Sequence, residues 1–372
     1  MNKTATWIVV IVVVILGIFW FGKTGNKKSG SINLGFIGPL TGDAANIGQN
    51  AKAAVEVAIE EVNAAGGVDG KTLNVIYEDG KCNGKDAANA ANKLINVDKV
   101  LAIVGAACSG ETSAFTGLAE QTKTVVLSYC SSAPALTTAG DYIFRNYPSD
   151  TYQGAFAAEY LKNTLTKNSA AVFYVKSDWG VGIRDVFKEK FAELGGMIVF
   201  DEGYEQTARE FRTTLSKIKT SGADVVYFVG YTEASIPMLK QAKELGVNLQ
   251  FFGADAWDDS KIWTDAGTSG EGAMYTVVSA NPSEGFKNAL AIKVGNNEVG
   301  ACSPTAYDAV HILAEVIEKV GTDSVKVKDA LYDVNHLGGV SSSIIKFDRN
   351  GDLIGANYII KKVSNSVTSE VK

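Results

Sequence analysis

Hydroxyl-bearing side chains follow two apolar segments that are typical of buried strands. Ser109 and Gly110 come after VLAIVGAAC and stand where a helix is expected to begin. Helix N-termini present unpaired N–H groups and partial positive charge, which suits an anion such as a carboxylate. Ser131 and Ser132 follow the next apolar segment, TVVLSYC. Taken alone, each feature also fits a helix cap or a serine-rich turn.

A different set of side chains follows the strand-like segments in the second half of the chain. Trp179 follows AAVFYVKSD, Tyr231 follows ADVVYFVG, and Asp255 follows LQFFGA. Ligands of open parallel sheets bind beyond the carboxyl ends of the strands, so both sets are expected to line one site. Hydroxyls on one side suit −COO⁻ and an acid on the other suits −NH₃⁺. The sequence therefore predicts a site for a small amino-acid-like ligand.

Short apolar segments alternate with amphipathic helical stretches from Ser31 onward, which predicts parallel sheets with helices on both faces. The alternation restarts after FRNYPSD, so we expect two doubly wound α/β lobes. The last hundred residues hold too few elements for a third core and are expected to complete both sheets, giving a hinge of several strands. SSSIIKFDRNGDLIGANYIIKKV has the pattern of a β-hairpin around Asn350-Gly351. The expected division is an anchor and linker at 1–30, one lobe at 31–148 plus 280–338, and another at 149–279 plus 339–365.

Composition argues against several classes of protein. The 372 residues exceed one ordinary core, and a net charge of −6 without a basic stripe argues against a nucleic-acid partner. GFIGPLTGD lacks the glycine spacing of a dinucleotide-binding loop, and His311 and His336 form no persuasive catalytic triad. The segment DRNGD at 348–352 is followed by Leu353, where a calcium loop needs glycine. We expect a protein that is not an enzyme and uses no cofactor or metal.

The N-terminus differs sharply from the rest of the chain. Thr4–Gly22 is uncharged and, as a helix, would span about 28 Å, which predicts a transmembrane anchor. A cleaved signal peptide is the alternative, although no clear small-residue site follows. Lys23, Lys27 and Lys28 would favour a cytoplasmic location for the folded part. The cysteines and the expected fold favour the extracytoplasmic face of the membrane instead.

Four cysteines, Cys82, Cys108, Cys130 and Cys302, form no C-x-x-C pair, so zinc and redox motifs are not indicated. An even number in an exported chain permits two disulfides, and buried free thiols are the alternative.

Several motifs together resemble the branched-chain amino acid (leucine/isoleucine/valine)-binding proteins of ABC transporters, which have the type I periplasmic binding protein fold. They are GFIGPLTGDAANIGQNAKAAVEVAIEEVNAAGG, VGAACSGET, SSAPALT, FRNYPSD and TAYDAVHIL. The resemblance runs from about Ile32 to Lys361. It implies a solute-binding protein that delivers its ligand to a membrane permease with its ATPase. A ligand-sensing ectodomain that signals through a separate membrane partner is the alternative.

The resemblance also implies roles for single residues. Ser109 resembles the serine that binds the ligand carboxylate, and Ser132 stands where threonine is usual. Asp255 stands where a glutamate takes the ammonium group. Tyr231 matches an aromatic of the second lobe, and Trp179 stands at a tyrosine position that covers the ligand.

The cysteines and one apolar residue complete this comparison. Cys82 and Cys108 fall where relatives carry a disulfide. Cys130 and Cys302 fall at positions that line the pocket, and they form either a second disulfide or two separate small residues. Ile47 replaces an aromatic that often covers the ligand. These departures mean that leucine, isoleucine or valine cannot be assumed as the ligand.

Overall fold

Short segments rich in Val, Ile and Phe form the strands of the first sheet, as their apolar pattern predicts. The computed structural model describes residues 30–296 and 299–371. Five parallel strands lie in the order β2-β1-β3-β4-β5. They are β1 (Ser31–Gly38), β2 (Thr72–Asp79), β3 (Ala102–Gly105), β4 (Val125–Ser128) and β5 (Ile143–Arg145).

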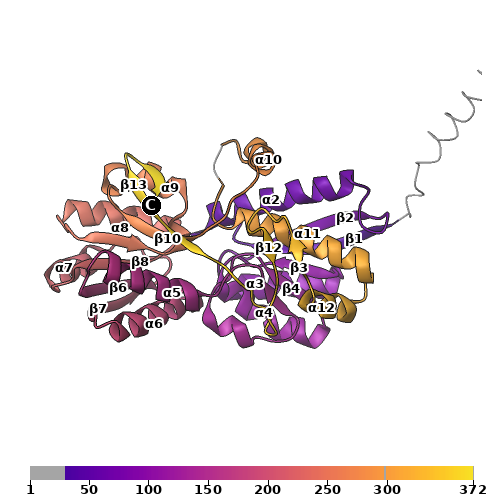
Figure 1. Cartoon of the computed structure of the whole chain (residues 1–372), viewed down its shortest axis with the longest axis horizontal. Coiled ribbons are helices and arrows are strands. Elements are labelled where there is room, and N and C mark those ends of the chain that lie inside the picture. Colours follow the sequence, from indigo (N-terminus) through magenta and orange to yellow (C-terminus); the bar gives the residue numbers. More distant parts are fainter. Residues whose placement is uncertain (1–29, 297–298, 372) are drawn as a thin grey trace, which may run out of the picture.

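Helices cover both faces of this sheet, because each carries one apolar face (Figure 1). On one face, α2 and α11 pack together, and Leu34 and Leu313 are fully buried in the shared core. On the other face, Ala87 of α3 and Phe115 of α4 pack with Ile37. The helices of this lobe are α2 (Ala45–Ala64), α3 (Gly84–Asn92), α4 (Ser109–Thr122), α10 (Glu284–Val294), α11 (Ser303–Val320) and α12 (Ser324–Tyr332).

The second sheet has seven strands in the order β14-β13-β10-β9-β8-β6-β7, and its last two strands in the chain run antiparallel to their neighbours. The strands are β6 (Ser169–Val175), β7 (Met197–Tyr204), β8 (Val225–Val229), β9 (Gln250–Gly253), β10 (Met274–Val278), β13 (Tyr358–Ser364) and β14 (Val367–Glu370). The helices are α5 (Asp150–Glu159), α6 (Asp178–Glu193), α7 (Arg212–Thr220), α8 (Thr232–Glu244) and α9 (Ser260–Ala266). The expected fold of two α/β lobes with parallel sheets is confirmed.

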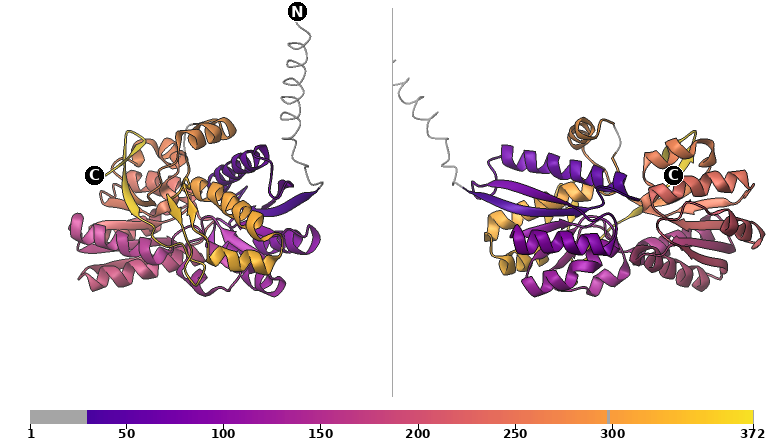
Figure 2. Two further views of the ribbon diagram at one scale, coloured as in Figure 1. Left: turned by 45° about the vertical axis from the view of Figure 1, so that its right-hand side comes forward. Right: turned by 180° about the vertical axis from the view of Figure 1, so that it is seen from behind.

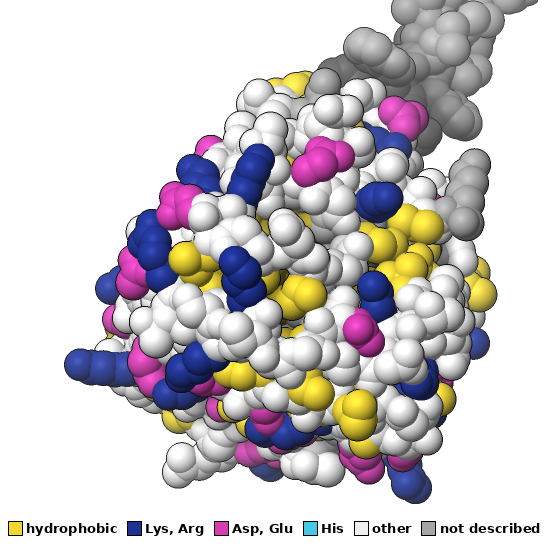
Figure 3. All heavy atoms as spheres, turned by 90° about the vertical axis from the view of Figure 1, so that its left-hand side faces the viewer, with side chains coloured by type: hydrophobic (Ala, Val, Ile, Leu, Met, Phe, Trp, Pro, Cys, Tyr) yellow, Lys and Arg dark blue, Asp and Glu magenta, His cyan; other side chains and the backbone are white. Residues whose placement is uncertain are grey.

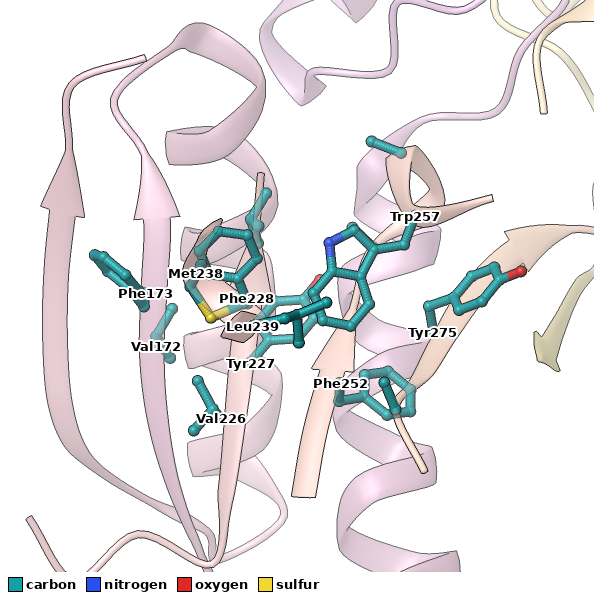
Figure 4. Close-up of a cluster of buried hydrophobic side chains, with 14 of the residues drawn as sticks. Val172, Phe173, Val226, Tyr227, Phe228, Met238, Leu239, Phe252, Trp257 and Tyr275 are labelled. Carbon is teal, nitrogen blue, oxygen red and sulfur yellow. The ribbon is translucent and has the colours of Figure 1, made fainter. Parts of the chain in front are cut away.

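An aromatic core beside β8 and β9 fixes the turn that follows β9 (Figure 4). Trp257 is fully buried, donates its indole N–H to the Ser235 hydroxyl at 2.9 Å, and meets Trp263 edge to face. Tyr227, Phe228, Phe252 and Tyr275 belong to the same core. Because Trp257 ends the short 3₁₀ turn Asp255–Trp257, this packing also holds Asp255 in place.

The chain crosses between the lobes after β5, after β10 and again before β13, and its C-terminus lies on the second lobe (Figure 2). The expected hairpin around Asn350-Gly351 is reduced to a tight turn with one bridge between Phe347 and Leu353. The strand expected to return from that turn instead pairs with β10.

The segment between α12 and β13 packs against the core of the first lobe. Strands β11 (His336–Leu337) and β12 (Ile344–Ile345) pair with each other, and Val340 and Phe347 are buried with the first sheet. The division proposed above places residues from 339 onward in the second lobe. If the lobes are divided by core packing, the part of the C-terminal segment that belongs to the second lobe begins only near Tyr358, at the start of β13.

Within residues 30–296 and 299–371, no helix combines the length and hydropathy that a membrane span requires. The anchor expected at Thr4–Gly22 lies outside the described residues.

The outer end of the second lobe carries acidic and basic side chains interspersed with small apolar groups (Figure 3). Ion pairs of this lobe include Lys217–Glu202 and Arg212–Glu244. The face shown therefore has no large area of one charge sign.

Candidate functional site

A pocket with an empty volume of about 450 Å³, partly open to solvent, lies between the two lobes. Its lining comes from loops at the carboxyl ends of strands, where an open parallel sheet offers unpaired backbone groups. The lining residues are Ile47, Ala107, Cys108, Ser109, Cys130, Ser132, Trp179, Tyr231, Asp255, Ala256, Asp258, Ala301 and Cys302. The structure thus brings together seven of the nine residues that the sequence predicts for the site.

Ser109 occupies the first position of α4 and is almost fully buried. Its Oγ accepts hydrogen bonds from the backbone N–H groups of Ser132 at 3.2 Å and Ala133 at 3.0 Å. With both lone pairs engaged, the hydroxyl proton is left to donate. Together with the helix N-terminus, this arrangement presents a donor and positive potential to the pocket.

Glu111, which the sequence analysis did not assign to the site, holds the start of α4 in place. Its carboxylate accepts the backbone N–H groups of Cys82 and Cys108, each at 3.0 Å. Complete burial raises the pKa of Glu111 to about 7, and these N–H donors oppose the rise. The Cys82–Cys108 disulfide, with a Cα–Cα distance of 5.3 Å, ties the same loop to the end of β2.

Two of the predicted residues do not line the pocket. Ser131 points into the first lobe, where its hydroxyl lies 2.7 Å from that of Thr112 and donates to the Ala106 carbonyl at 3.1 Å. Gly110 follows Ser109 along α4 and lies outside the pocket. Both positions are structural parts of the loops that carry Ser109 and Ser132.

Ser132 lines the pocket, but its hydroxyl donates to the buried Asp150 carboxylate at 2.8 Å. Its oxygen therefore faces the pocket mainly as an acceptor. The sequence instead predicts a hydroxyl donor at this position for the ligand carboxylate.

A second disulfide, Cys130–Cys302, forms part of the wall, with a Cα–Cα distance of 5.5 Å. It joins the loop after β4 to the residue before α11, across 172 positions of sequence. The sequence leaves open a second disulfide or two separate small residues at these positions, and the structure contains the disulfide.

Non-reducing peptide mapping of the oxidised full chain should therefore recover two linked pairs, Cys82–Cys108 and Cys130–Cys302. Both pairs satisfy the Cα separation that a disulfide needs. An alkylatable thiol at Cys302 in protein folded under oxidising conditions would contradict the second bond and leave the first intact.

The second lobe contributes two aromatic rings. Trp179, near the start of α6, and Tyr231, just before α8, have ring centroids 4.8 Å apart. Both side chains are buried. Both rings line the pocket on the side of the second lobe.

Asp255 supplies the carboxylate of the second lobe. Its Oδ2 accepts from the Tyr147 hydroxyl at 2.6 Å and its Oδ1 from the Ala256 backbone N–H at 3.0 Å. Burial raises the pKa of Asp255, while these donors lower it. An unpaired buried carboxylate is costly, so the site favours a cation beside Asp255.

A polar network that sequence reasoning missed lies behind Asp255. The Gln153 amide, in the orientation that satisfies both its ends, donates to Asp150 Oδ1 at 2.8 Å and accepts the Asp255 backbone N–H at 2.9 Å. Burial and the Asp255 charge raise the pKa of Asp150. Tyr147, Asp150 and Gln153 come from the crossover motif FRNYPSD and the helix after it. The motif FRNYPSD is the feature of the sequence that could have pointed to this network.

Contacts between the lobes also occur outside the pocket. The Asn46 amide donates to Asp259 at 2.7 Å, and Asp43 forms an ion pair with Arg209. These pairs join α2 and its preceding loop to the second lobe. The two lobes are therefore closed on each other.

Comparisons with known proteins agree with this geometry. The family described as periplasmic binding protein matches residues 31–366. A leucine-, isoleucine-, valine-, threonine- and alanine-binding protein of Pseudomonas aeruginosa is 32% identical over 348 residues, 92% of each chain.

Solved structures show the same similarity. A leucine-binding protein of Thermotoga maritima has a TM-score of 0.85 at 27% identity, over 92% of this chain and 98% of that one. A branched-chain amino acid transporter substrate-binding protein of Streptococcus pneumoniae, in complex with isoleucine, has a TM-score of 0.83 at 26% identity, over 92% and 99%.

Proposed function

Because this chain belongs to the periplasmic binding protein family, we propose that it captures a small α-amino acid between its lobes for delivery to an ABC transporter. The observation that carries the ligand class is one pocket with a hydroxyl donor at a helix N-terminus on one wall and a buried carboxylate on the other. These two groups are complementary to the two charges of a zwitterion.

Ser109 is the proposed partner of the ligand carboxylate, since its oxygen already accepts two N–H groups and its proton is free to donate. Asp255 is the proposed partner of the ammonium group. The Ser132 oxygen is a further acceptor for that group, because its own proton goes to Asp150. Trp179 and Tyr231 cover the ligand, and the Cys130–Cys302 disulfide, Ala301 and Ile47 surround its side chain. Gly110 and Ser131 have no direct role in this assignment.

Closure of the two lobes links binding to transport. A ligand that contacts both walls favours the closed form, because only this form makes all the contacts. The partners we propose are a membrane permease that recognises the closed form and its ATPase. Thr4–Gly22 is the proposed anchor that holds the protein on the extracytoplasmic face.

Thermal-shift measurements on the full chain test the proposal. A set of α-amino acids should include some that raise the melting temperature, because a ligand at 100 times its Kd stabilises the native state by about 2.7 kcal/mol. The matched controls are analogues that lack only the amino or only the carboxyl group, which should give much smaller shifts. Stabilisation by sugars or nucleosides and by none of the amino acids would refute the zwitterion site.

A further inference from the structure

A second hollow adjoins the ligand pocket and is far more polar. It has an empty volume of about 850 Å³, partly open to solvent. It shares Ile47, Asp258, Ala301 and Cys302 with the first pocket, so the two are continuous. Its other lining residues are Asn46, Asn50, Asp259, Ser260, Trp263, Tyr275, Val299, Gly300, Lys361, Ser366, Val367 and Thr368.

Asp258 stands at the junction of the two spaces with one unused oxygen. Its Oδ1 accepts both the Tyr275 hydroxyl at 2.8 Å and the Lys361 ammonium at 2.6 Å. Its Oδ2 has no hydrogen bond within the described part of the chain, although only 12% of the side chain is exposed. Lys361 neutralises the charge of Asp258, and two of its three N–H donors are without a described partner.

Asn50, from α2, also lines the hollow, and its amide makes no hydrogen bond to any described residue. It is half-buried, and its Nδ2 lies beside Gly300. By contrast, the neighbouring Asn46 amide is engaged with Asp259 at 2.7 Å. The hollow thus offers an acceptor at Asp258, a donor and an acceptor at Asn50, and donors at Lys361.

An aliphatic side chain that entered this hollow would displace water from those polar groups and offer them no hydrogen bond in return, which is costly. A cation would meet Lys361, and an anion would meet Asp258. A neutral group that both donates and accepts is compatible with all three residues, because it brings no charge that Lys361 or Asp258 would repel. Ile47, Ala301 and Cys302 line both spaces and are apolar. They suit a short methylene chain that leads from the first pocket to such a group.

We propose that this hollow is a second subsite, which binds a carboxamide at the end of the ligand's side chain. The proposal rests on the amino-acid site described above and narrows its ligand class. The preferred ligand would be an amino acid of the glutamine type, rather than a branched aliphatic one.

Calorimetry with the full chain compares glutamine with leucine, which is close in size. We expect glutamine to bind at least about 10-fold more tightly, because a site built for hydrogen bonds rejects analogues that lack them. Asn50→Leu should weaken glutamine binding by about 10-fold and change leucine binding by less than about 2-fold. Gln49→Leu, an exposed position on the same helix, is the matched control and should change neither.

The outcomes separate this proposal from the one on which it rests. Unchanged leucine binding by the Asn50→Leu variant verifies that it is folded. If it does not fold, Asn50→Ala takes its place in the same measurements. Equal affinity for leucine and glutamine, equal losses for both on Asn50 substitution, or tighter binding of lysine would overturn the subsite and leave the amino-acid site standing. If no α-amino acid binds, both proposals fail.

Discussion

Replacing Asp255 with asparagine should weaken the binding of an α-amino acid by about 100- to 4000-fold. Removal of one member of a buried charge pair costs about 3–5 kcal/mol, because the other charge stays desolvated without a partner. Asp255 is 5% exposed, and Tyr147 and Ala256 hold its carboxylate in the pocket wall. Titration calorimetry of the native chain and the variant measures the loss.

The des-amino analogue of the same ligand separates this role from a general loss of structure. It carries no cation, so the native chain and Asp255→Asn should bind it with similar, weak affinity. A loss of the same size for the amino acid and its des-amino analogue would remove Asp255 from the ammonium site.

The pH dependence of binding gives an independent readout of the same group. Burial raises the pKa of Asp255, and the ammonium group is expected to bind the ionised carboxylate. Amino-acid affinity should therefore fall as the pH drops through that raised pKa, and binding near it should release protons. Calorimetry in buffers of different ionisation enthalpy detects this release, which the Asp255→Asn variant should lack.

Local sequence patterns predict most elements of the fold because each element carries its own signal. Apolar residues at helical spacing predict helices at 47–65 and 304–320, close to the observed α2 (Ala45–Ala64) and α11 (Ser303–Val320). Two short elements escape this reasoning. Strand β5 (Ile143–Arg145) is three residues long, and α9 (Ser260–Ala266) covers two turns, so neither is long enough to show a hydrophobic periodicity in the sequence.

Pairing between distant segments is harder to predict than the segments themselves. The turn at Asn350-Gly351 exists, but the strand after it, Tyr358–Ser364, pairs with β10 rather than folding back on its predecessor. Turn residues specify a local reversal of the chain. They do not determine which strand edge the following segment reaches.

Site prediction meets the same limit at the level of single side chains. Residues that directly follow strands, such as Ser109, Tyr231 and Asp255, line the pocket because strand ends converge there. Sequence cannot decide between adjacent hydroxyls, and only Ser132 of the serine pair reaches the pocket. Asp150 and Gln153 join the site through contacts across the hinge, which no local pattern specifies.

Replacing Asp352 with asparagine should reduce the free energy of unfolding by about 3–5 kcal/mol, because it leaves the Arg145 guanidinium buried without a counter-charge. Arg145, at the end of β5, is 3% exposed at its side chain. Its Nε and Nη2 donate to the two oxygens of Asp352 at 2.6 and 2.8 Å. This pair fastens the returning C-terminal segment to the first sheet beside the first crossover.

An ion pair of the same lobe whose acidic member is exposed provides the control for this substitution. Asp329→Asn removes the partner of Lys328, but Asp329 is 63% exposed, so solvent screening should limit the loss to below about 1 kcal/mol. Urea unfolding of both variants, followed by circular dichroism, measures the difference. Small and equal effects would mean that Arg145 is adequately held by the Ala133 carbonyl and the Thr137 hydroxyl alone, at 2.8 and 2.7 Å. A large effect confined to Asp352→Asn would show that the buried charge pair stabilises the attachment of the C-terminal segment to the first lobe, beyond what the apolar packing of Val340 and Phe347 provides.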